Sequence, residues 1–420
     1  MIKHIFKQIW TERRQNSWIT IELIVVFFFL LIASDFMWLR VKTYYEPTGF
    51  DIENTYILAL KQLEPIAPDY ISPENNPQTP MDDLSDLISR IQTYPDIETY
   101  SLSYHALPYS MSGIWSSLKV DSTHTKTIRQ WAVTPSYFDV FHIRTSNNEP
   151  FHIENPEHKQ IILTEDMANV LFGSAQQAIG KNVYYSRSRE EDTPFRVISV
   201  STHYKHQEFR PYEGGFFEIL TLPELEKWVN KNKVTNVNIC VRVRPGSAKH
   251  FEQNFIADMG DRLKENNLYV SSIIPSEKLR NEVVDKRVQT EIVPMTYVMI
   301  FVLITVFLGV FGTFWLRIRQ RRSEIGIRMA MGAGRGVIRH SMITESFCLI
   351  AIAILPALLV YINLLHANIL DTWRLPFTFG RVAIVFVIAL FVIVIIVASG
   401  TSYPARQASQ LNPVDALRDE

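Results

Sequence analysis

IVPMTYVMIFVLITVFLGVFGTFWL, residues 292–316, is a run of 25 residues without Asp, Glu, Lys, Arg or His. As a helix it would be about 37 Å long, which exceeds the roughly 30 Å hydrocarbon core of a bilayer. Two later runs, 346–365 and 382–399, are uncharged in the same way. Helices in soluble cores seldom stay uncharged over such lengths, so the sequence predicts three membrane spans here.

A fourth span is predicted at 18–39, although Glu22 and Asp35 lie near its ends. Leu23–Ala33 is unbroken apolar sequence, and charges at the ends of a span can reach the lipid headgroups. We therefore favour headgroup anchoring for these two carboxylates over a proton path. A cleaved signal peptide is disfavoured, because the basic segment before the apolar run is long and no small-x-small site follows it.

Composition excludes several classes of protein. The chain is 47% hydrophobic and 12% aromatic, with a formal net charge of −1. Its apolar residues concentrate in the four windows, and the remainder has the composition of a water-soluble fold. A wholly soluble enzyme, a disordered chain and a compact membrane bundle are therefore excluded, and the charge gives no sign of nucleic-acid binding.

Basic residues near the spans predict the orientation of the chain. The segment 317–340 holds seven arginines and one acidic residue, Glu324, and residues 1–17 are also net basic. Short segments rich in Lys and Arg stay in the cytoplasm. By contrast, 40–291 has more acidic than basic residues and 366–381 is nearly neutral. Both termini are therefore predicted inside, with 40–291 outside.

The predicted fold class is a membrane protein with four transmembrane α-helices plus a large mixed α+β extracytoplasmic domain between spans 1 and 2. In chain order we expect an amphipathic cytoplasmic helix, span 1, the outer domain with its stalk, span 2, a cytoplasmic loop, span 3, a short outer loop, span 4 and a cytoplasmic tail. The corresponding residues are 1–17, 18–39, 40–291, 292–316, 317–345, 346–365, 366–381, 382–399 and 400–420.

Periodicity within 40–291 indicates both helices and strands. Apolar residues fall on one helical face in Asp82–Tyr94, whereas Val237–Val243 alternates in the manner of a half-buried strand. Phe251–Leu263 is typical of an amphipathic helix with Ile256 on its apolar face. Ile161–Thr164 is expected to be a strand that leads into a short helix, and Phe195–Val200 another strand.

Loops between these elements suggest how the outer domain is divided. Polar, proline-containing stretches near 63–80 and 144–158 are candidate loops between two subdomains, with a provisional boundary near residue 130. From Pro275 the chain has few helix breakers, so it is expected to continue as one helix into span 2. Pro294 is expected to open that span, and Pro356 to kink span 3.

The chain shows no catalytic motif. The nearest approach to a phosphate-binding loop is Gly173–Asn182, whose two glycines are seven residues apart instead of five. Gly332, Gly334 and Gly336 follow no strand, so they are expected to break a helix. We therefore expect a protein that is not an enzyme, with no catalytic residues.

Metal and disulfide chemistry have little support. His203 and His206 could lie one helical turn apart as metal ligands, but two solvated histidines in a polar loop are favoured. Cys240 belongs to the outer domain and Cys348 to span 3, so they cannot pair. We expect no metal site and no internal disulfide.

The segment LRIRQRRSEIGIRMAMGAGRGVIRHSMITESF, residues 316–347, is the most informative part of the chain. Ser323 is expected to cap a short helix whose first turn holds Glu324, four residues before Arg328. The glycines from Gly332 onward end this helix, and a second one begins near Arg335. The residues alone favour equally a helix that docks a partner and a helix that packs against its own chain.

Part of this segment, RRSEIGIRMAMGAGRGVIRHSMITES (321–346), resembles the loop after span two in the MacB/FtsX-type permease family of ABC transporters. The tail YPARQASQLNPVDALRDE (403–420) resembles the family's closing motif, and TPSYFDVFHI (134–143), IILTEDMANVLFG (161–173) and FRVISV (195–200) resemble its extracytoplasmic domain. The segment Arg144–Pro150 departs from the pattern, because it lacks a Gly-Arg pair.

The resemblance implies a permease subunit that works with cytoplasmic ABC ATPase subunits supplied by another chain. ATP and Mg²⁺ would be bound by that ATPase, so no cofactor is expected in this chain. It also implies that the loop forms a coupling helix, with Arg328 as the salt-bridge donor to the ATPase. The expected docking surface is Glu324, Ile325, Gly326, Arg328, Met331, Gly332 and Ala333. The expected tail motif is Pro404, Ala405, Arg406, Pro413, Ala416 and Leu417.

The function implied by the resemblance is export driven by mechanotransmission. Closure of the ATPase pair would move the spans and the outer domain, and so expel substrates from the periplasm or the outer leaflet. The alternative is an ATPase-driven signalling or scaffold protein that switches a periplasmic partner such as a cell-wall hydrolase. Other expected partners are a second permease copy, a periplasmic adaptor or outer-membrane protein, and membrane lipid, but no nucleic acid. The expected location is the bacterial inner membrane, with both termini cytoplasmic.

Overall fold

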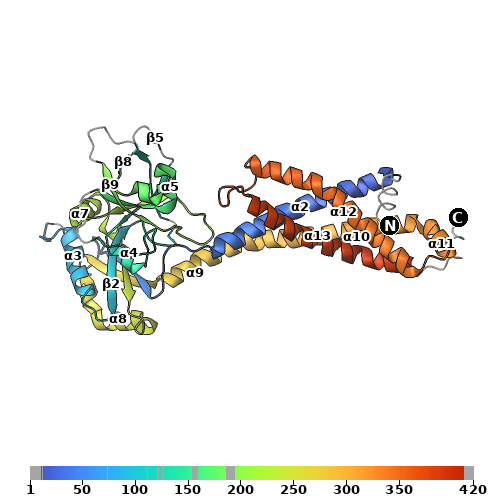
Figure 1. Ribbon diagram of the computed structural model, residues 1–420. Coiled ribbons are helices and arrows are strands. Elements are labelled where there is room, and N and C mark those ends of the chain that lie inside the picture. The colour runs from blue at the N-terminus through green and yellow to red at the C-terminus, as the bar shows by residue number, and fades with distance from the viewer. Residues whose placement is uncertain are drawn as a thin grey trace. The chain divides into compact units, whose positions relative to one another are not determined.

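The computed structural model describes residues 11, 13–72, 74–110, 112–120, 123–124, 127–153, 159–185 and 194–410. The chain divides into two compact units. The helical unit comprises Met1–Tyr44 and Val288–Glu420, and the sheet unit comprises Tyr45–Arg287 (Figure 1). The predicted amphipathic helix at 1–17 lies mostly outside the described residues.

Among the described residues, four helical segments are long and apolar enough to cross a membrane: Ser17–Tyr45, Ser276–Gln320, Arg335–His366 and Phe379–Gln407. Each predicted apolar window lies inside one of these segments. The helical unit contains α2 (Arg13–Tyr45), α10 (Val293–Gln320), α11 (Arg322–Ala330), α12 (Arg335–His366) and α13 (Phe379–Ala408). The predicted fold class is confirmed, since a domain of mixed helices and strands separates the first long helix from the others.

Pro294 lies in the first turn of α10, as predicted, although the backbone before it is helical as well. The backbone is helical through Ser276–Gln320, and the proline follows a π-helical turn at Val288–Ile292. A proline inside an α-helix cannot donate to the carbonyl four residues earlier and clashes with it, and a wider turn just before the proline relieves this conflict. Pro356 likewise lies inside α12.

The sheet unit is built on a mixed sheet with the strand order β12-β13-β1-β11-β2-β6-β10-β7-β9-β8-β4-β5, and β3 also pairs with β6. Its strands are β1 (Thr55–Gln62), β2 (Ile97–Tyr104), β3 (Ile114–Ser116), β4 (Leu118–Val120), β5 (Thr123–His124), β6 (Ile128–Val133), β7 (Gln160–Thr164), β8 (Asn182–Tyr185), β9 (Phe195–Ser201), β10 (Gly215–Ile219), β11 (Val237–Val243), β12 (Lys264–Glu265) and β13 (Leu268–Pro275). The provisional subdomain boundary near residue 130 falls within β6, a central strand, so one sheet runs through both halves.

Helices cover both faces of this sheet. They are α3 (Pro80–Ile91), α4 (Tyr137–Val140), α5 (Glu165–Phe172), α6 (Ala175–Ala178), α7 (Leu222–Lys231), α8 (Phe251–Met259) and α9 (Ser276–Arg287), with 3₁₀ turns at Val234–Asn236, Ala248–His250 and Gly260–Leu263. The predicted helix at 82–94 is α3, which begins with a Thr79–Asp82 capping box and buries its apolar face. The predicted strands at 161–164 and 195–200 are β7 and β9.

Two details of the sheet unit differ from the sequence prediction. The strand β11 is covered on both faces, because its valines belong to one core cluster while Cys240 belongs to another and Arg242 is buried as well. The Arg242 side chain donates to the carbonyls of Val140, Glu53 and Asp51 at 2.6, 2.9 and 3.1 Å. Ile256 is 48% exposed, since α8 turns its Phe251–Phe255–Met259 face to the core.

A candidate docking site at helix α11

The short helix between spans two and three forms where the sequence predicts it. α11 runs from Arg322 to Ala330, with Glu324 in its first turn and Arg328 in its last, so both charges complement the helix dipole. Ser323 is not its N-cap, because the helix has already begun at Arg322 and the capping position belongs to Arg321. The prediction of a serine cap was therefore wrong.

A glycine-dependent reversal ends α11. Gly332 has φ +93°, a left-handed conformation that costs a glycine little. Its N–H donates to the carbonyl of Met329, and the N–H of Ala333 donates to that of Arg328, both at 3.0 Å. This pair of bonds is the Schellman arrangement that closes many helices. α12 then begins at Arg335, in agreement with the sequence prediction.

One face of α11 packs against the helical unit. Ile325 and Ile338 are 4% and 5% exposed, and Ile318, Met329, Ala333 and Met342 pack around them. Gly326 is also buried. Three of the seven residues predicted to form a docking surface, Ile325, Gly326 and Ala333, thus face the protein's own core in this conformation.

The opposite face of α11, the turn after it and the first turn of α12 present apolar side chains to the outside. Met331 is 77% exposed, Ile327 48% and Val337 62%. Gly332 is exposed as well. Sequence reasoning did not select Ile327 and Val337. The exposure of Ile327 could have been predicted from its position two residues after Ile325, because this spacing places the two side chains on different faces of a helix.

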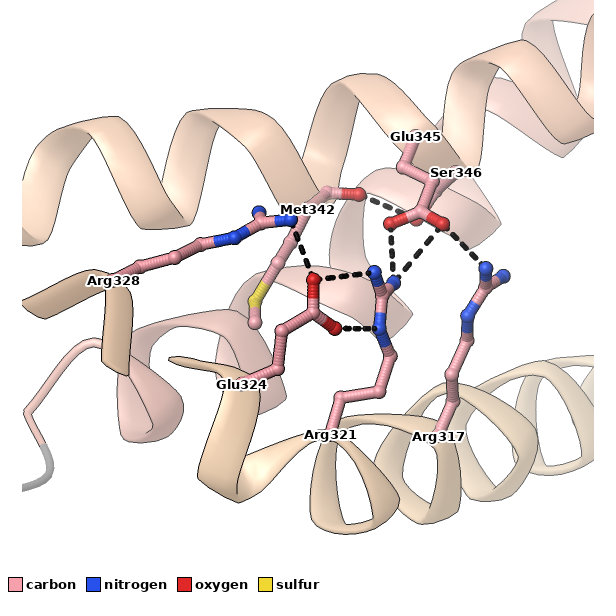
Figure 2. Close-up of polar contacts among 7 residues, drawn as sticks. All are labelled: Arg317, Arg321, Glu324, Arg328, Met342, Glu345 and Ser346. Atoms are coloured by element: carbon pink, nitrogen blue, oxygen red, sulfur yellow. Dashed lines mark hydrogen bonds and ion pairs between the residues drawn. The ribbon is translucent and has the colours of Figure 1, made fainter. Parts of the chain in front are cut away.

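A network of five charged residues connects α11 to the two spans that flank it (Figure 2). Glu324 accepts hydrogen bonds from Arg321 Nε at 2.8 Å and from Arg328 Nη2 at 2.5 Å. Arg321 Nη1 also donates to both oxygens of Glu345 in α12, at 3.1 and 2.9 Å. Arg317 of α10 forms a further ion pair with Glu345. Arg328, predicted to bind a partner, is thus paired within the chain and 39% exposed.

Three members of this charge network are buried more deeply than a surface cluster. The side chains of Arg317, Glu345 and Arg321 are 10%, 11% and 17% exposed. They line a cavity of about 20 Å³ together with Phe314, Ile318, Met342, Ser346 and Thr401, which is enough for one water molecule. Glu345 lies just before the apolar window 346–365. A carboxylate at the end of a membrane span is a candidate functional residue, and sequence reasoning did not select this one.

The tail motif is partly described. Pro404 and Ala405 are buried in the last turns of α13, and Arg406 is exposed. Beside them, the Tyr403 ring stacks on Trp315 of α10 with centroids 5.9 Å apart and an interplanar angle of 8°. The other tail residues, Pro413, Ala416 and Leu417, lie outside the described residues.

The carboxylates of span 1 contact other helices. Glu22 accepts a hydrogen bond from Thr313 of α10 at 2.8 Å. Asp35 is 4% exposed and binds Arg381 of α13 through two hydrogen bonds, of 2.7 and 2.6 Å. Headgroup anchoring was therefore the wrong role for Asp35, which is a buried ion-pair partner.

The candidate metal ligands do not converge. His203 lies 3.0 Å from the Asp166 carboxylate and is half exposed, whereas His206 is buried 3.6 Å from Glu213. Residues 202–214 lack helical structure, so the predicted one-turn spacing is absent. Burial, together with nearby arginines, lowers the pKa of His206 to about 3, so its ring is neutral near pH 7. Within the described ranges, no group of three or more His, Cys, Asp or Glu side chains could hold a metal.

The segment 202–214, which we call the polar loop, is buried and fastened to α9. Its Lys205, His206, Gln207 and Glu208 are at most 6% exposed. Glu208 accepts hydrogen bonds from Arg280 at 2.6 Å and from Tyr109 at 3.0 Å. Arg287 donates to the side-chain oxygen of Gln207 at 3.0 Å. α9 is thus held to the core of the sheet unit by two arginines.

Replacement of Arg280 by methionine is expected to destabilise the sheet unit by about 2 kcal/mol, because it leaves the buried Glu208 carboxylate with one donor fewer. Thermal unfolding of the full chain in detergent, with hydrogen exchange of residues 204–209, would measure the effect. Lys278→Met, an exposed position on the same helix, is the control and should change neither. Unaltered exchange in Arg280→Met would contradict the assignment.

Comparison with known proteins connects this architecture to a family. Residues 41–254 match the MacB-like periplasmic core domain, which is more than half of the chain, and residues 296–413 match the FtsX-like permease C-terminal domain. The chain belongs to the MacB/FtsX family of ABC transporter permeases. The family resemblance seen in the sequence is thereby confirmed, and the four apolar helices are those of a multi-pass membrane permease.

Relatives of this permease are named as export proteins. The chain is 30% identical over 301 residues to a macrolide export ATP-binding/permease protein MacB 1 of Yersinia pestis, which covers 69% of this chain and 43% of that protein. It is 22% identical over 298 residues to a probable export ATP-binding/permease protein of Pseudomonas fluorescens, which covers 68% of this chain and 42% of that protein. The permease thus spans less than half the length of these relatives.

A solved structure of the periplasmic region of MacB from Actinobacillus actinomycetemcomitans overlaps 58% of this chain and 98% of its own, at 13% identity and a TM-score of 0.34. Because this score is low, the family assignment rests on the sequence matches.

Proposed function

We propose that this permease is the membrane subunit of an ABC exporter, and that α11 docks a cytoplasmic ATPase carried by a separate chain. The names of the relatives support an ATPase partner, because they are called ATP-binding/permease proteins and this chain matches a permease model. That the ATPase is a separate chain is part of the proposal. ATP and Mg²⁺ are then bound by the partner.

The observation that carries the proposal is the exposed apolar side chains of α11 and of the turn and helix start that follow it. Met331, Ile327 and Val337 belong to the basic segment 317–340, which the positive-inside rule places in the cytoplasm. Exposed apolar side chains ringed by charges are typical of a surface that binds another protein. We refine the docking surface accordingly: Met331, Ile327, Val337 and Gly332 make the contact, and Glu324 and Arg328 lie at its edge.

The transport step follows from this placement. Nucleotide-driven closure of two ATPase subunits would displace α11 in each of two permease copies. The movement would pass along span two into the outer domain, which expels substrate from the outer side of the inner membrane. A periplasmic adaptor or outer-membrane partner would receive that substrate. Both termini lie in the cytoplasm in this scheme.

Met331→Glu is expected to lower the amount of copurifying ATPase at least tenfold, because it places a charge in the centre of the apolar contact. The substitution is at an exposed side chain, so the melting temperature should not change. Ile369→Glu is the matched control, since Ile369 is also exposed, at 68%, but lies in the loop between α12 and α13. Full ATPase recovery with Met331→Glu would exclude this docking surface.

The signalling alternative shares the docking step, so it needs a different measurement. Compounds that stimulate ATP hydrolysis by the complex in proteoliposomes would support export. A stable complex with an outer enzyme, without any transported compound, would support switching instead.

A further inference from the structure

Arg321 occupies an unusual position in the backbone. α10 ends at Gln320 and α11 begins at Arg322, so this one residue separates the two helices. Its φ and ψ of −103° and 19° belong to neither helix. A change in the angle between span two and the docking helix would therefore involve rotation about the bonds of Arg321.

The side chain of the same residue opposes that rotation. The guanidinium group of Arg321 binds Glu324 on α11 and Glu345 on α12 at the same time, with contacts between 2.8 and 3.1 Å. Arg317, one turn earlier on α10, binds Glu345 as well. Figure 2 shows the four side chains as one continuous chain of contacts. Three helices are thus held together at the joint between α10 and α11.

The part of this network formed by Arg317, Arg321 and Glu345 has low exposure and is therefore rigid, whereas Glu324 is 40% exposed. A surface ion pair contributes little, whereas a buried one becomes costly to break because a charge is left without its partner. Arg321 and Glu345 are 17% and 11% exposed. Arginine suits the position because its planar fork can bind two carboxylates in fixed directions, which the single ammonium group of lysine cannot do.

We propose that Arg321 is a positioning residue that locks the angle between the docking helix and spans two and three, so that the three helices move as one body when the ATPase acts on α11. Glu345 is the buried anchor of this lock. The inference rests on the proposed function, since it describes how a movement that the ATPase causes in α11 would reach spans two and three. Without the lock, α11 still binds the ATPase but swings about its joint, and the movement is lost before it reaches the spans.

The test compares Arg321→Gln and Glu345→Gln with Arg319→Gln in the full chain. Arg319 is the matched control, because it is an exposed arginine two residues away whose described contact is the Trp315 ring. Spin labels at residues 327 on α11 and 355 on α12, in a chain without its native cysteines, report the distance distribution between the two helices. We expect the width of this distance distribution to at least double in Arg321→Gln and Glu345→Gln. In Arg319→Gln the distribution should stay as narrow as in the wild type.

The second readout is the stimulation of ATPase activity by the permease, measured as the rate of the complex over that of the ATPase alone. It should fall at least fivefold in Arg321→Gln while copurification persists, a separation that a general loss of fold would not produce. Should Arg321→Gln fold poorly, Arg321→Lys keeps the charge and should still broaden the distribution. A narrow distribution in these variants overturns the lock. Failure of the wild-type chain to bind any ATPase would instead overturn the proposed function, since the distance measurement needs the chain alone.

Discussion

Replacing Arg381 by methionine is expected to lower the free energy of unfolding of the helical unit by about 3–5 kcal/mol, because Asp35 would remain buried as an unpaired charge. The Arg381 side chain is 1% exposed and that of Asp35 is 6% exposed. Arg381 also donates to the carbonyls of Asp371, at 3.1 Å, and Leu375. It therefore fixes the loop before α13 as well as span one.

Thermal unfolding of the full-length protein in detergent would measure this loss. The double variant Asp35→Leu/Arg381→Met should recover most of it, since two apolar side chains of similar size leave no buried charge. Arg339→Met, at an exposed position on α12, serves as the control and should leave the melting temperature unchanged. If Arg381→Met unfolded at the wild-type temperature, the pair would contribute little to stability.

The second large effect concerns Glu218 and pH. Glu218 lies on β10 and is 8% exposed. Burial, together with the nearby Glu224 carboxylate, raises the pKa of Glu218 from 4.5 to about 7, against the opposing effects of Gln130, Tyr185 and Lys159. Gln130 and Tyr185 contact it through hydrogen bonds. Its neutral form is thus favoured in the folded state.

The sign of the pH effect follows from that shift. Because the pKa is higher in the folded than in the unfolded state, stability from this group is present below pH 4.5 and is lost as the pH rises through 7. The loss amounts to roughly 3 kcal/mol at 1.4 kcal/mol per pKa unit. Glu218→Gln cannot ionise, so it should match the wild type at pH 4 and exceed its stability at pH 8 by up to this amount.

Melting temperatures of the two proteins between pH 4 and pH 8 would check the prediction. Glu226→Gln, an exposed acid on α7, controls for the general effect of removing one carboxylate. Parallel pH profiles of the wild type and Glu218→Gln would show that the pKa of Glu218 is the same in the folded and unfolded states, which would contradict the shift.

Local sequence patterns predict the elements of this protein well. The uncharged windows correspond to the long helices, and the glycines after Met331 end α11 as expected because backbone conformation depends on neighbouring residues. The charged partners could not be predicted in this way. Asp35 and Arg381 are 346 residues apart in sequence, and Glu345 meets Arg321 only after two helices have packed. Periodicity carries no information about such pairs.

The same reason explains the errors over faces and burial. The spacing of Ile256 places it on an apolar stripe of the helix. In the folded domain, however, Phe251 and Phe255 of the same helix pack into the core and Ile256 does not. The polar loop at 202–214 has the composition of a solvated segment, but α9 and the sheet enclose it. Ile325 and Ile327 are chemically equivalent in the sequence, and their opposite environments follow from how α11 packs on Ile338.

The reversal at Gly332 has a mechanical consequence. The connection between Ala330 and Arg335 is short, and two backbone hydrogen bonds close its turn. A short turn transmits a displacement better than a long loop, which would absorb it by changing shape. If an ATPase displaces α11, this turn passes the movement to span three as long as the contacts of Arg321 with Glu324 and Glu345 fix the angle between α11 and α12.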